Sequence, residues 1–190
     1  MPVLHLLCGP NGAGRSSYVH DVLEPSTGLP FINADEIAAE LWPSSQVEHV
    51  YDAAKIAEDR RRERIAKGSS FITETVFSHS SKIDLVSDAV DAGYLVHLHV
   101  VMVPVELTVQ RVRERVCRGG HDVPEHKIRD RYERLWSHIY QAIRLADEAE
   151  VFDNSRAGKP FRLCASFEHG DLIDTPSWPR WTPAALIHDK

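Results

Sequence analysis

Short apolar runs alternate with longer amphipathic stretches along most of the chain. Residues 94–103 are apolar at nearly every position, which predicts a strand buried on both faces. Residues 3–8 form a similar run, and the stretch after residue 103 places Val105, Val109 and Val112 at helical spacing. Strands that alternate with helices in this way predict a three-layer α/β fold with a parallel sheet.

The same pattern predicts the remaining elements. We expect strands at residues 29–33, 69–74 and 151–152, an edge strand over 160–167, and helices at residues 16–23, 36–41, 46–67, 80–92, 104–118 and 125–148. The parallel sheet would therefore have about five strands. One domain would span residues 1–170, and residues 171–190 would form an irregular tail that packs on its body.

Composition narrows the class of protein. The 190 residues are 43% hydrophobic and 26% charged, as in an ordinary globular domain, and no apolar run is long enough for a membrane helix. We therefore expect a cytoplasmic protein with no membrane partner. The net charge of −6 argues against a general nucleic-acid binder, yet arginines cluster between Arg111 and Arg134. That cluster predicts an anionic partner.

The cysteines and histidines predict no metal site. The cysteines are an odd number without ligand-like spacing, which argues against both a disulfide framework and a zinc site: Cys8, Cys117 and Cys164. Three histidines lie in predicted strands without a carboxylate at ligand spacing, and we interpret them as core residues: His5, His97 and His99.

The most specific motif lies between the first strand and the first helix. Residues 9–17 read GPNGAGRSS and fit the phosphate-loop pattern G-x-x-x-x-G-K-[ST], except that Arg15 stands at the lysine position. Glycines let backbone N–H groups approach a polyphosphate, and the helix N-terminus adds positive partial charge. We therefore predict a P-loop fold in which Ser16 coordinates Mg²⁺ and the nucleotide is bound by Gly9, Pro10, Asn11, Gly12, Ala13, Gly14, Arg15, Ser16 and Ser17.

Further polar residues follow other predicted strands, whose carboxyl ends share one ligand-binding edge in an open parallel sheet. Asp35 is placed to accept the proton of a substrate hydroxyl, although Asp is also a favoured helix cap. Glu74 would bind substrate hydroxyls or hold the water shell of the metal, and its position alone leaves that open. A glycine pair at residues 119–120 lies between arginine-bearing helices, which predicts a helical lid over about residues 118–131.

Several segments, in this order, resemble the zeta-toxin-like kinases. They are residues 9–14 (GPNGAG), 31–36 (FINADE), 73–75 (TET), 118–124 (RGGHDVP) and 128–132 (IRDRY). The resemblance covers about residues 3–168 and implies a small P-loop phosphotransferase. The zeta toxins themselves phosphorylate a sugar hydroxyl of UDP-N-acetylglucosamine with ATP or GTP and Mg²⁺.

The resemblance also implies roles for individual residues. Asp35 would be the general base. Arg15 departs from the lysine of the family, and its role of neutralising phosphate charge is inferred from the loop motif instead. The substrate side would include Glu74 and Thr75, the lid arginines would be Arg118 and either Arg129 or Arg131, and Asn154 would lie near the nucleotide base. The family also suggests an antitoxin protein as a partner.

We therefore predict an ATP- or GTP-dependent phosphotransferase that acts on a hydroxyl of a small molecule, such as UDP-N-acetylglucosamine. Arg15 supports an alternative, a non-catalytic nucleotide-binding module with a degenerate P-loop, because a planar guanidinium does not replace a compact ammonium. A third interpretation is a site for nucleic-acid ends, as in polynucleotide kinases. The negative net charge counts against that third interpretation.

Overall fold

The computed structural model describes residues 1–117 and 123–187. Its strands are β1 Val3–Cys8, β2 Phe31–Ile32, β3 Phe71–Thr75, β4 Leu95–Met102, β5 Glu148–Asp153, β6 Arg162–Glu168 and β7 Asp171–Leu172. Its helices are α1 Arg15–Tyr18, the π-helical η1 Val19–Leu23, α2 Glu24–Thr27, α3 Ala34–Leu41, α4 Val50–Ala66, α5 Ser81–Asp91, α6 Val105–Cys117, α7 Glu125–Leu145 and α8 Ala184–Ile187. Within the described ranges, no helix is both long enough and apolar enough to cross a bilayer.

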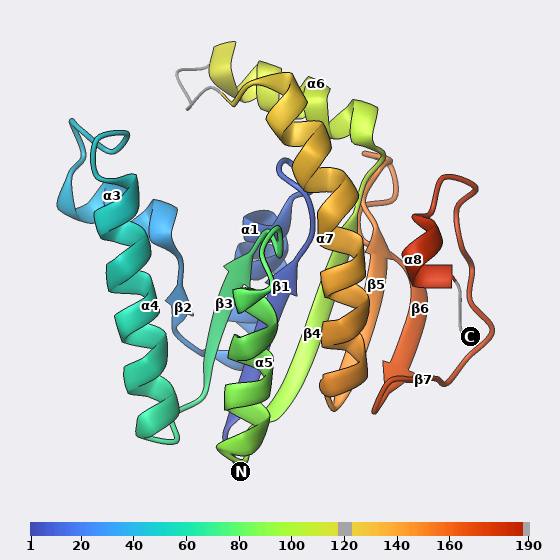
Figure 1. The fold of residues 1–190 in the computed structure, drawn as a ribbon, viewed down its shortest axis with the longest axis horizontal. Coiled ribbons are helices and arrows are strands. Elements are labelled where there is room, and N and C mark those ends of the chain that lie inside the picture. The colour runs from blue at the N-terminus through green and yellow to red at the C-terminus, as the bar shows by residue number, and fades with distance from the viewer. Residues whose placement is uncertain (118–122, 188–190) are drawn as a thin grey trace.

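All strands of the described residues belong to one sheet, in the order β2-β3-β1-β4-β5-β6-β7 (Figure 1). Strands β1 to β5 are parallel, whereas β6 and β7 join antiparallel at one side. Cys8 at the end of β1 pairs with Thr75 on β3 and Val100 on β4, so these strands reach one shared edge. The predicted α/β P-loop fold, with five parallel strands, is confirmed.

Helices cover both faces of the sheet and enclose its core. Helices α4, α5 and α7 cover the face turned toward the viewer in Figure 1, where Leu6, Leu98, Leu135 and Ile139 are fully buried. The continuous helix formed by α1, η1 and α2 packs on the opposite face through Val19 and its neighbours. This double coverage explains why β1 and β4 are apolar on both faces.

The chain after α7 differs from the sequence prediction. Helix α7 ends at Leu145 rather than at residue 148, and residues 148–150 begin β5 instead. A carboxylate oxygen of Asp147 accepts a hydrogen bond of 2.8 Å from the Val96 N–H, which fixes the chain against β4 where the helix ends. The expected tail, residues 171–190, contains β7 and α8, and Leu186 of α8 is buried against the core.

Helix α6 and the first turns of α7 extend past the carboxyl edge of the sheet (Figure 1). They flank the predicted lid. Residues 118–122, which include Arg118 and the glycine pair, lie outside the described residues. The predicted phosphate contact of Arg118 therefore stays a prediction.

Candidate active site

The loop between β1 and α1 requires glycine for steric reasons. Gly9, Gly12 and Gly14 have φ angles of 145°, 70° and 92°, a region that other residues rarely adopt. A Cβ atom on Gly9 would lie 2.2 Å from the Val101 carbonyl oxygen, because the loop passes directly over the end of β4. Gly14 has no room for a side chain either, since its Cβ would lie 2.6 Å from the Asn154 amide nitrogen.

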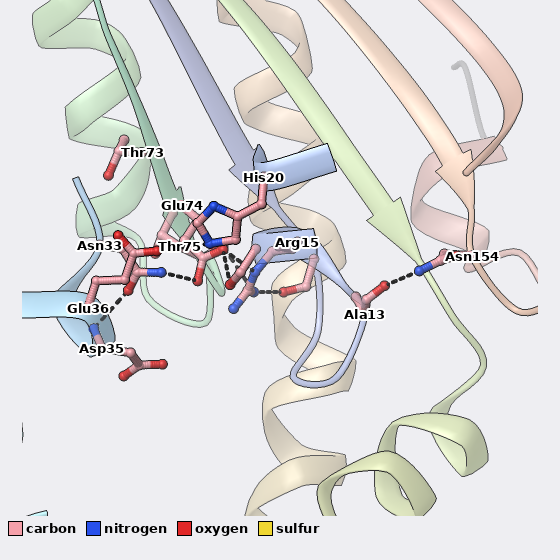
Figure 2. A network of polar contacts seen from close by, with 12 residues as sticks. Ala13, Arg15, His20, Asn33, Asp35, Glu36, Thr73, Glu74, Thr75 and Asn154 are labelled. Atoms are coloured by element: carbon pink, nitrogen blue, oxygen red, sulfur yellow. Dashed lines mark hydrogen bonds and ion pairs between the residues drawn. The ribbon is translucent and has the colours of Figure 1, made fainter. Parts of the chain in front are cut away.

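Two side chains from distant elements hold the carbonyl groups of this loop. Arg111 on α6 donates hydrogen bonds of 3.0 Å to the carbonyl oxygens of Gly12 and Asn154. Asn154, just after β5, donates one of 2.8 Å to the Ala13 carbonyl (Figure 2). No hydrogen bond between described residues uses the N–H of Gly12, Gly14 or Arg15 as its donor. These unpaired donors at the start of α1 fit the oxygens of a phosphate group.

Arg15 does not extend freely from the loop. Its guanidinium donates to the carbonyl oxygens of Gly9 and, over 3.3 Å, of Thr75 at the end of β3. Its Nε lies 3.9 Å from a carboxylate oxygen of Glu74, too far for a hydrogen bond, and this buried nitrogen has no hydrogen-bond partner among the described residues. Arg15 thus connects the loop to β3 while keeping one unsatisfied donor in the site.

Glu74 lies at the centre of the polar network in Figure 2. Its two carboxylate oxygens accept hydrogen bonds from the Ser16 hydroxyl, over 3.0 Å, and from the Asn33 amide, over 3.2 Å. The Glu74 side chain is 10% exposed, so these contacts compensate a nearly buried charge. The structure thereby brings together Ser16 and Glu74, which the sequence placed at the same edge of the sheet.

Asp35 lies in the first turn of α3 and is exposed. The helix cap is Asn33, whose side-chain oxygen accepts a hydrogen bond of 2.7 Å from the Asp35 N–H. The alternative role of Asp35 as the cap is therefore wrong. The Asp35 carboxylate points away from Glu74 in Figure 2 and makes no hydrogen bond or ion pair with another described residue.

Glu36 and His20 also belong to this region, although sequence reasoning did not select them. A carboxylate oxygen of Glu36 lies 3.0 Å from Nε2 of His20. Burial raises the pKa of the Glu36 carboxyl, His20 lowers it, and the negative charges of Glu24 and Glu74 raise it further. Glu36 directly follows Asp35 in the segment FINADE, so the sequence could have identified Glu36 as a site residue. No motif near His20 indicates a role in the site.

The candidate lid arginines of α7 differ in their surroundings. Arg129 donates to both carboxylate oxygens of Glu106, over 2.8 and 2.9 Å, and to Glu125 over 2.9 Å. These contacts raise the pKa of Arg129 and direct it toward α6. Arg131 is half-buried and forms no ion pair with any described residue. It lies seven residues before His138, which contacts the Phe77 carbonyl, so Arg131 shares the helix face directed toward the β3–α5 connection.

The predicted core histidines pair with one another and with carboxylates of β5. Nδ1 of His5 and Nε2 of His99 are 3.0 Å apart, and Glu148 and Glu150 approach His97 and His99. Burial and the two neighbouring histidines lower the pKa of His5 to about 4, and Glu150 opposes this shift. The carboxylates come from a neighbouring strand, which sequence spacing could not reveal. The described residues contain no cluster of three or more histidines, cysteines and carboxylates that could hold a metal ion.

A pocket of about 350 Å³ adjoins the polar network. Glu74 and Thr75 of β3 line it, together with Ala34 of α3, the neighbour of Asp35. The remaining lining residues come from α4 and α5. A pocket of this volume suits a small molecule. A larger pocket of about 480 Å³ lies on the outer side of α6, and no P-loop residue lines it.

Two comparisons match the sequence to known proteins. Residues 4–135 match the family model described as "AAA domain". An uncharacterised protein of Haemophilus influenzae is 30% identical over 129 residues, which are 66% of this chain and 89% of that protein.

Three solved structures illustrate the similarity in fold. A complex of AvrRxo1-ORF1 and AvrRxo1-ORF2 with ATP matches with a TM-score of 0.71 and 17% identity, over 91% of this chain and 60% of the matched chain. The PezAT toxin–antitoxin system of Streptococcus pneumoniae matches with a TM-score of 0.57 and 18% identity, over 80% of this chain and 68% of that one. Shikimate kinase from Acinetobacter baumannii, in complex with shikimate, matches with a TM-score of 0.54 and 15% identity, over 83% of this chain and 86% of that one.

These matches bear on the predicted family. This chain spans about 60% of the length of the AvrRxo1 chain that it matches. The family model, in contrast, covers more than half of this chain and includes the P-loop, Asp35 and Glu74. The chain belongs to the AAA domain family, and its fold is that of the P-loop kinases.

Proposed function

We propose that the protein is a phosphotransferase that uses ATP or GTP with Mg²⁺ to phosphorylate a hydroxyl group of a small molecule. One observation carries the proposal. The Ser16–Glu74 hydrogen bond joins the phosphate loop to the wall of a pocket that is large enough for a small acceptor. A phosphate donor in the loop and an acceptor in the pocket would therefore meet at Glu74.

The loop residues suit the donor nucleotide. The unpaired N–H groups of Gly12, Gly14 and Arg15, together with the unsatisfied Nε of Arg15, offer donors to phosphate oxygens. Ser16 and Glu74 have the hard oxygen atoms that Mg²⁺ prefers, and they would hold the ion beside the phosphates of the nucleotide. Bound there, Mg²⁺ would neutralise charge on the transferring phosphate. The nucleotide-binding residues would be those of the loop, with Asn154 holding the loop in shape.

The acceptor side needs a general base. We assign this role to Asp35, because its carboxylate is free of hydrogen bonds and ion pairs to described residues and its lone pairs are available to a substrate hydroxyl. Its side chain would have to turn from the direction seen in Figure 2 toward an acceptor at Glu74. Glu74 is less suited, since both of its oxygens already accept hydrogen bonds. Arg131, which has no ion pair with any described residue, would reach the transferring phosphate from α7, while the contacts of Arg129 direct it elsewhere.

The test measures ADP or GDP release by the purified protein with a panel of nucleotide sugars and other hydroxyl compounds. We expect release that depends on an acceptor, and Asp35→Asn should lower kcat by about 10²- to 10⁴-fold while nucleotide affinity stays within about twofold. Asp59→Asn is a matched control, because Asp59 is exposed on α4 and belongs neither to the phosphate loop nor to the segment that joins β2 to α3. Equal turnover in Asp35→Asn would remove Asp35 as the base.

A non-catalytic nucleotide-binding module is the second candidate, and the contacts of Arg15 favour it. In P-loop enzymes the equivalent position carries a mobile ammonium that reaches the terminal phosphates. Here the guanidinium is bound to the carbonyls of Gly9 and Thr75. A wild-type chain that binds ATP and releases no ADP with any acceptor would establish this second function.

A more specific proposal is that the protein is a toxin with an antitoxin partner. It is supported by the resemblance of the quoted segments to the zeta-toxin-like kinases and by the fold similarity to PezAT, a toxin–antitoxin system. The AvrRxo1 structure is likewise a complex of two proteins. Growth arrest on induced expression, abolished by Asp35→Asn, would support the toxin role.

A further inference from the structure

The pocket beside Glu74 is lined by side chains of both charges. Glu74 and Thr75 line it beside the phosphate loop. The walls from α4 and α5 carry three cationic side chains, Lys55, Arg61 and Lys82. No sequence pattern pointed to these residues, because α4 is charged along most of its length and α5 is a separate element.

Arg61 and Lys82 are half-buried, yet no hydrogen bond or ion pair between described residues involves either side chain. Burial lowers the pKa of Arg61, and burial together with the charge of Arg61 lowers the pKa of Lys82. Glu58 also lines the pocket: it forms an ion pair with Arg62 over 2.6 Å, and its negative charge raises the pKa of both Arg61 and Lys82. The single carboxylate of Glu58 therefore offsets only part of the positive charge of the neighbouring cations, and a bound anion would relieve the remaining repulsion.

We propose that Arg61 and Lys82 form an anion subsite, so that the acceptor carries a phosphate or carboxylate group at one end and its reacting hydroxyl at the other. The inference rests on the proposed phosphotransferase function for the identity of the ligand as an acceptor. An anion at Arg61 and Lys82 would place the opposite end of a small molecule at Glu74 and Thr75, beside the phosphate loop. Guanidinium and ammonium groups both bind phosphate and carboxylate, and the guanidinium binds them bidentately.

The subsite also explains how the pocket would select its acceptor. The carboxylate of Glu74 disfavours a second anion beside the loop, whereas Arg61 and Lys82 favour one against α4 and α5. An acceptor with a single anionic group would therefore bind in one orientation, with its hydroxyl toward Glu74. An uncharged sugar would lack that orientation and would bind weakly.

The test uses the full chain with the phosphate loop first saturated by a non-hydrolysable ATP analogue and Mg²⁺, because the free loop would bind the probe itself. Inorganic phosphate and malonate, which distinguish a phosphate site from a carboxylate site, are titrated in by calorimetry. We expect one binding site per chain for at least one of them. Arg61→Gln and Lys82→Gln should each weaken that binding by about tenfold or more.

Arg60→Gln is the matched control, because Arg60 is exposed on the same helix and does not line the pocket. It should change the affinity by less than about twofold. Arg61 and Lys82 lie on different helices, so one variant remains usable if the other fails to fold. Absence of anion binding to the loaded wild type, or unchanged affinity in both Gln variants, overturns the subsite.

The outcomes also separate this inference from the proposed function. If the chain binds the anion at Arg61 and Lys82 but phosphorylates no hydroxyl, the subsite is supported and the phosphotransferase function is refuted. A chain that phosphorylates uncharged acceptors, and whose loaded form binds neither anion, keeps the phosphotransferase and refutes the subsite.

Discussion

The two sides of the candidate active site are built differently. On the nucleotide side, the chain itself satisfies the carbonyls of the loop through Arg111, Asn154 and Arg15. On the acceptor side, Asp35 is free and the cations of the pocket have no ion-pair partner among the described residues. The loop is therefore shaped before any ligand arrives, while the acceptor pocket is left with charges that a ligand would complement.

Because of this difference, we expect substitutions on the two sides to affect different properties of the protein. A change on the nucleotide side removes contacts that the fold itself uses, so it should reduce stability as well as nucleotide binding. A change on the acceptor side removes no contact between described residues at Asp35 or Lys82, so it should alter turnover or ligand binding with little effect on stability. On the nucleotide side, we expect the loss of stability to decrease from Gly9 to Arg111 to His5.

Gly9→Ala should break the nucleotide side. The added Cβ would lie 2.2 Å from the Val101 carbonyl oxygen, at a φ of 145°, so both the loop and the end of β4 would have to move. We expect a loss of about 3–5 kcal/mol in the free energy of unfolding, measured in urea, together with loss of ATP binding.

Gly158→Ala is the control for this experiment, because a Cβ at Gly158 would meet nothing within 4 Å. It should change stability by less than about 0.5 kcal/mol. A Gly9→Ala variant as stable as the wild type would show that the loop is not preformed by the fold, and the contrast between the two sides would fail.

Arg111→Ala should loosen the loop without unfolding the protein. It removes the hydrogen bonds to the carbonyls of Gly12 and Asn154, and hydrogen bonds from a charged group contribute about 1.5–3 kcal/mol. We expect stability to fall by about 2 kcal/mol and ATP affinity by about tenfold. Arg113→Ala, on the same helix, removes an exposed pair with Glu125 and should be nearly neutral. Equal ATP affinity in the two variants would contradict the role of Arg111.

The sequence predicted more of the nucleotide side than of the acceptor side, for a physical reason. The loop is a local motif, so Gly9, Gly14 and Ser16 could be recognised within a few residues of one another. Periodicity likewise predicted the parallel strands, since their burial on both faces leaves a continuous apolar pattern. The order of the strands was not predicted, because it depends on pairing between distant segments.

The contacts that complete the site are long-range, and the sequence could not reveal them. Arg111 is 99 residues from Gly12, and Asn154 is 141 residues from Ala13. The pocket joins α4 to α5, and only the fold places Arg61 beside Lys82. Local sequence was also ambiguous at the start of α3. Asn33 and Asp35 are both favoured capping residues, and the structure shows that Asn33 caps the helix.

Acid should weaken the nucleotide side, through His5. The pKa of His5 is lowered from 6.5 to about 4, so the folded state holds this histidine neutral while the unfolded state can protonate it. The stabilising contribution is present above pH 6.5 and is lost as the pH falls toward 4, because the unfolded state then binds more protons. The histidine pair lies beneath α1, where the ring centroids of His99 and Tyr18 are 5.6 Å apart, so the loss should act on the helix that begins at the loop.

Unfolding in urea between pH 7 and 4.5 measures this effect. Glu150 also faces the histidines and has a lowered pKa, so part of the acid destabilisation belongs to its carboxylate. His5→Gln removes only the contribution of His5, and it should reduce the total loss by about 1–2 kcal/mol after allowance for solvent screening. His169→Gln is the control, because the His169 side chain is 71% exposed and lies far along the chain from β1. Identical pH profiles for wild type and His5→Gln would place the acid sensitivity elsewhere in the molecule.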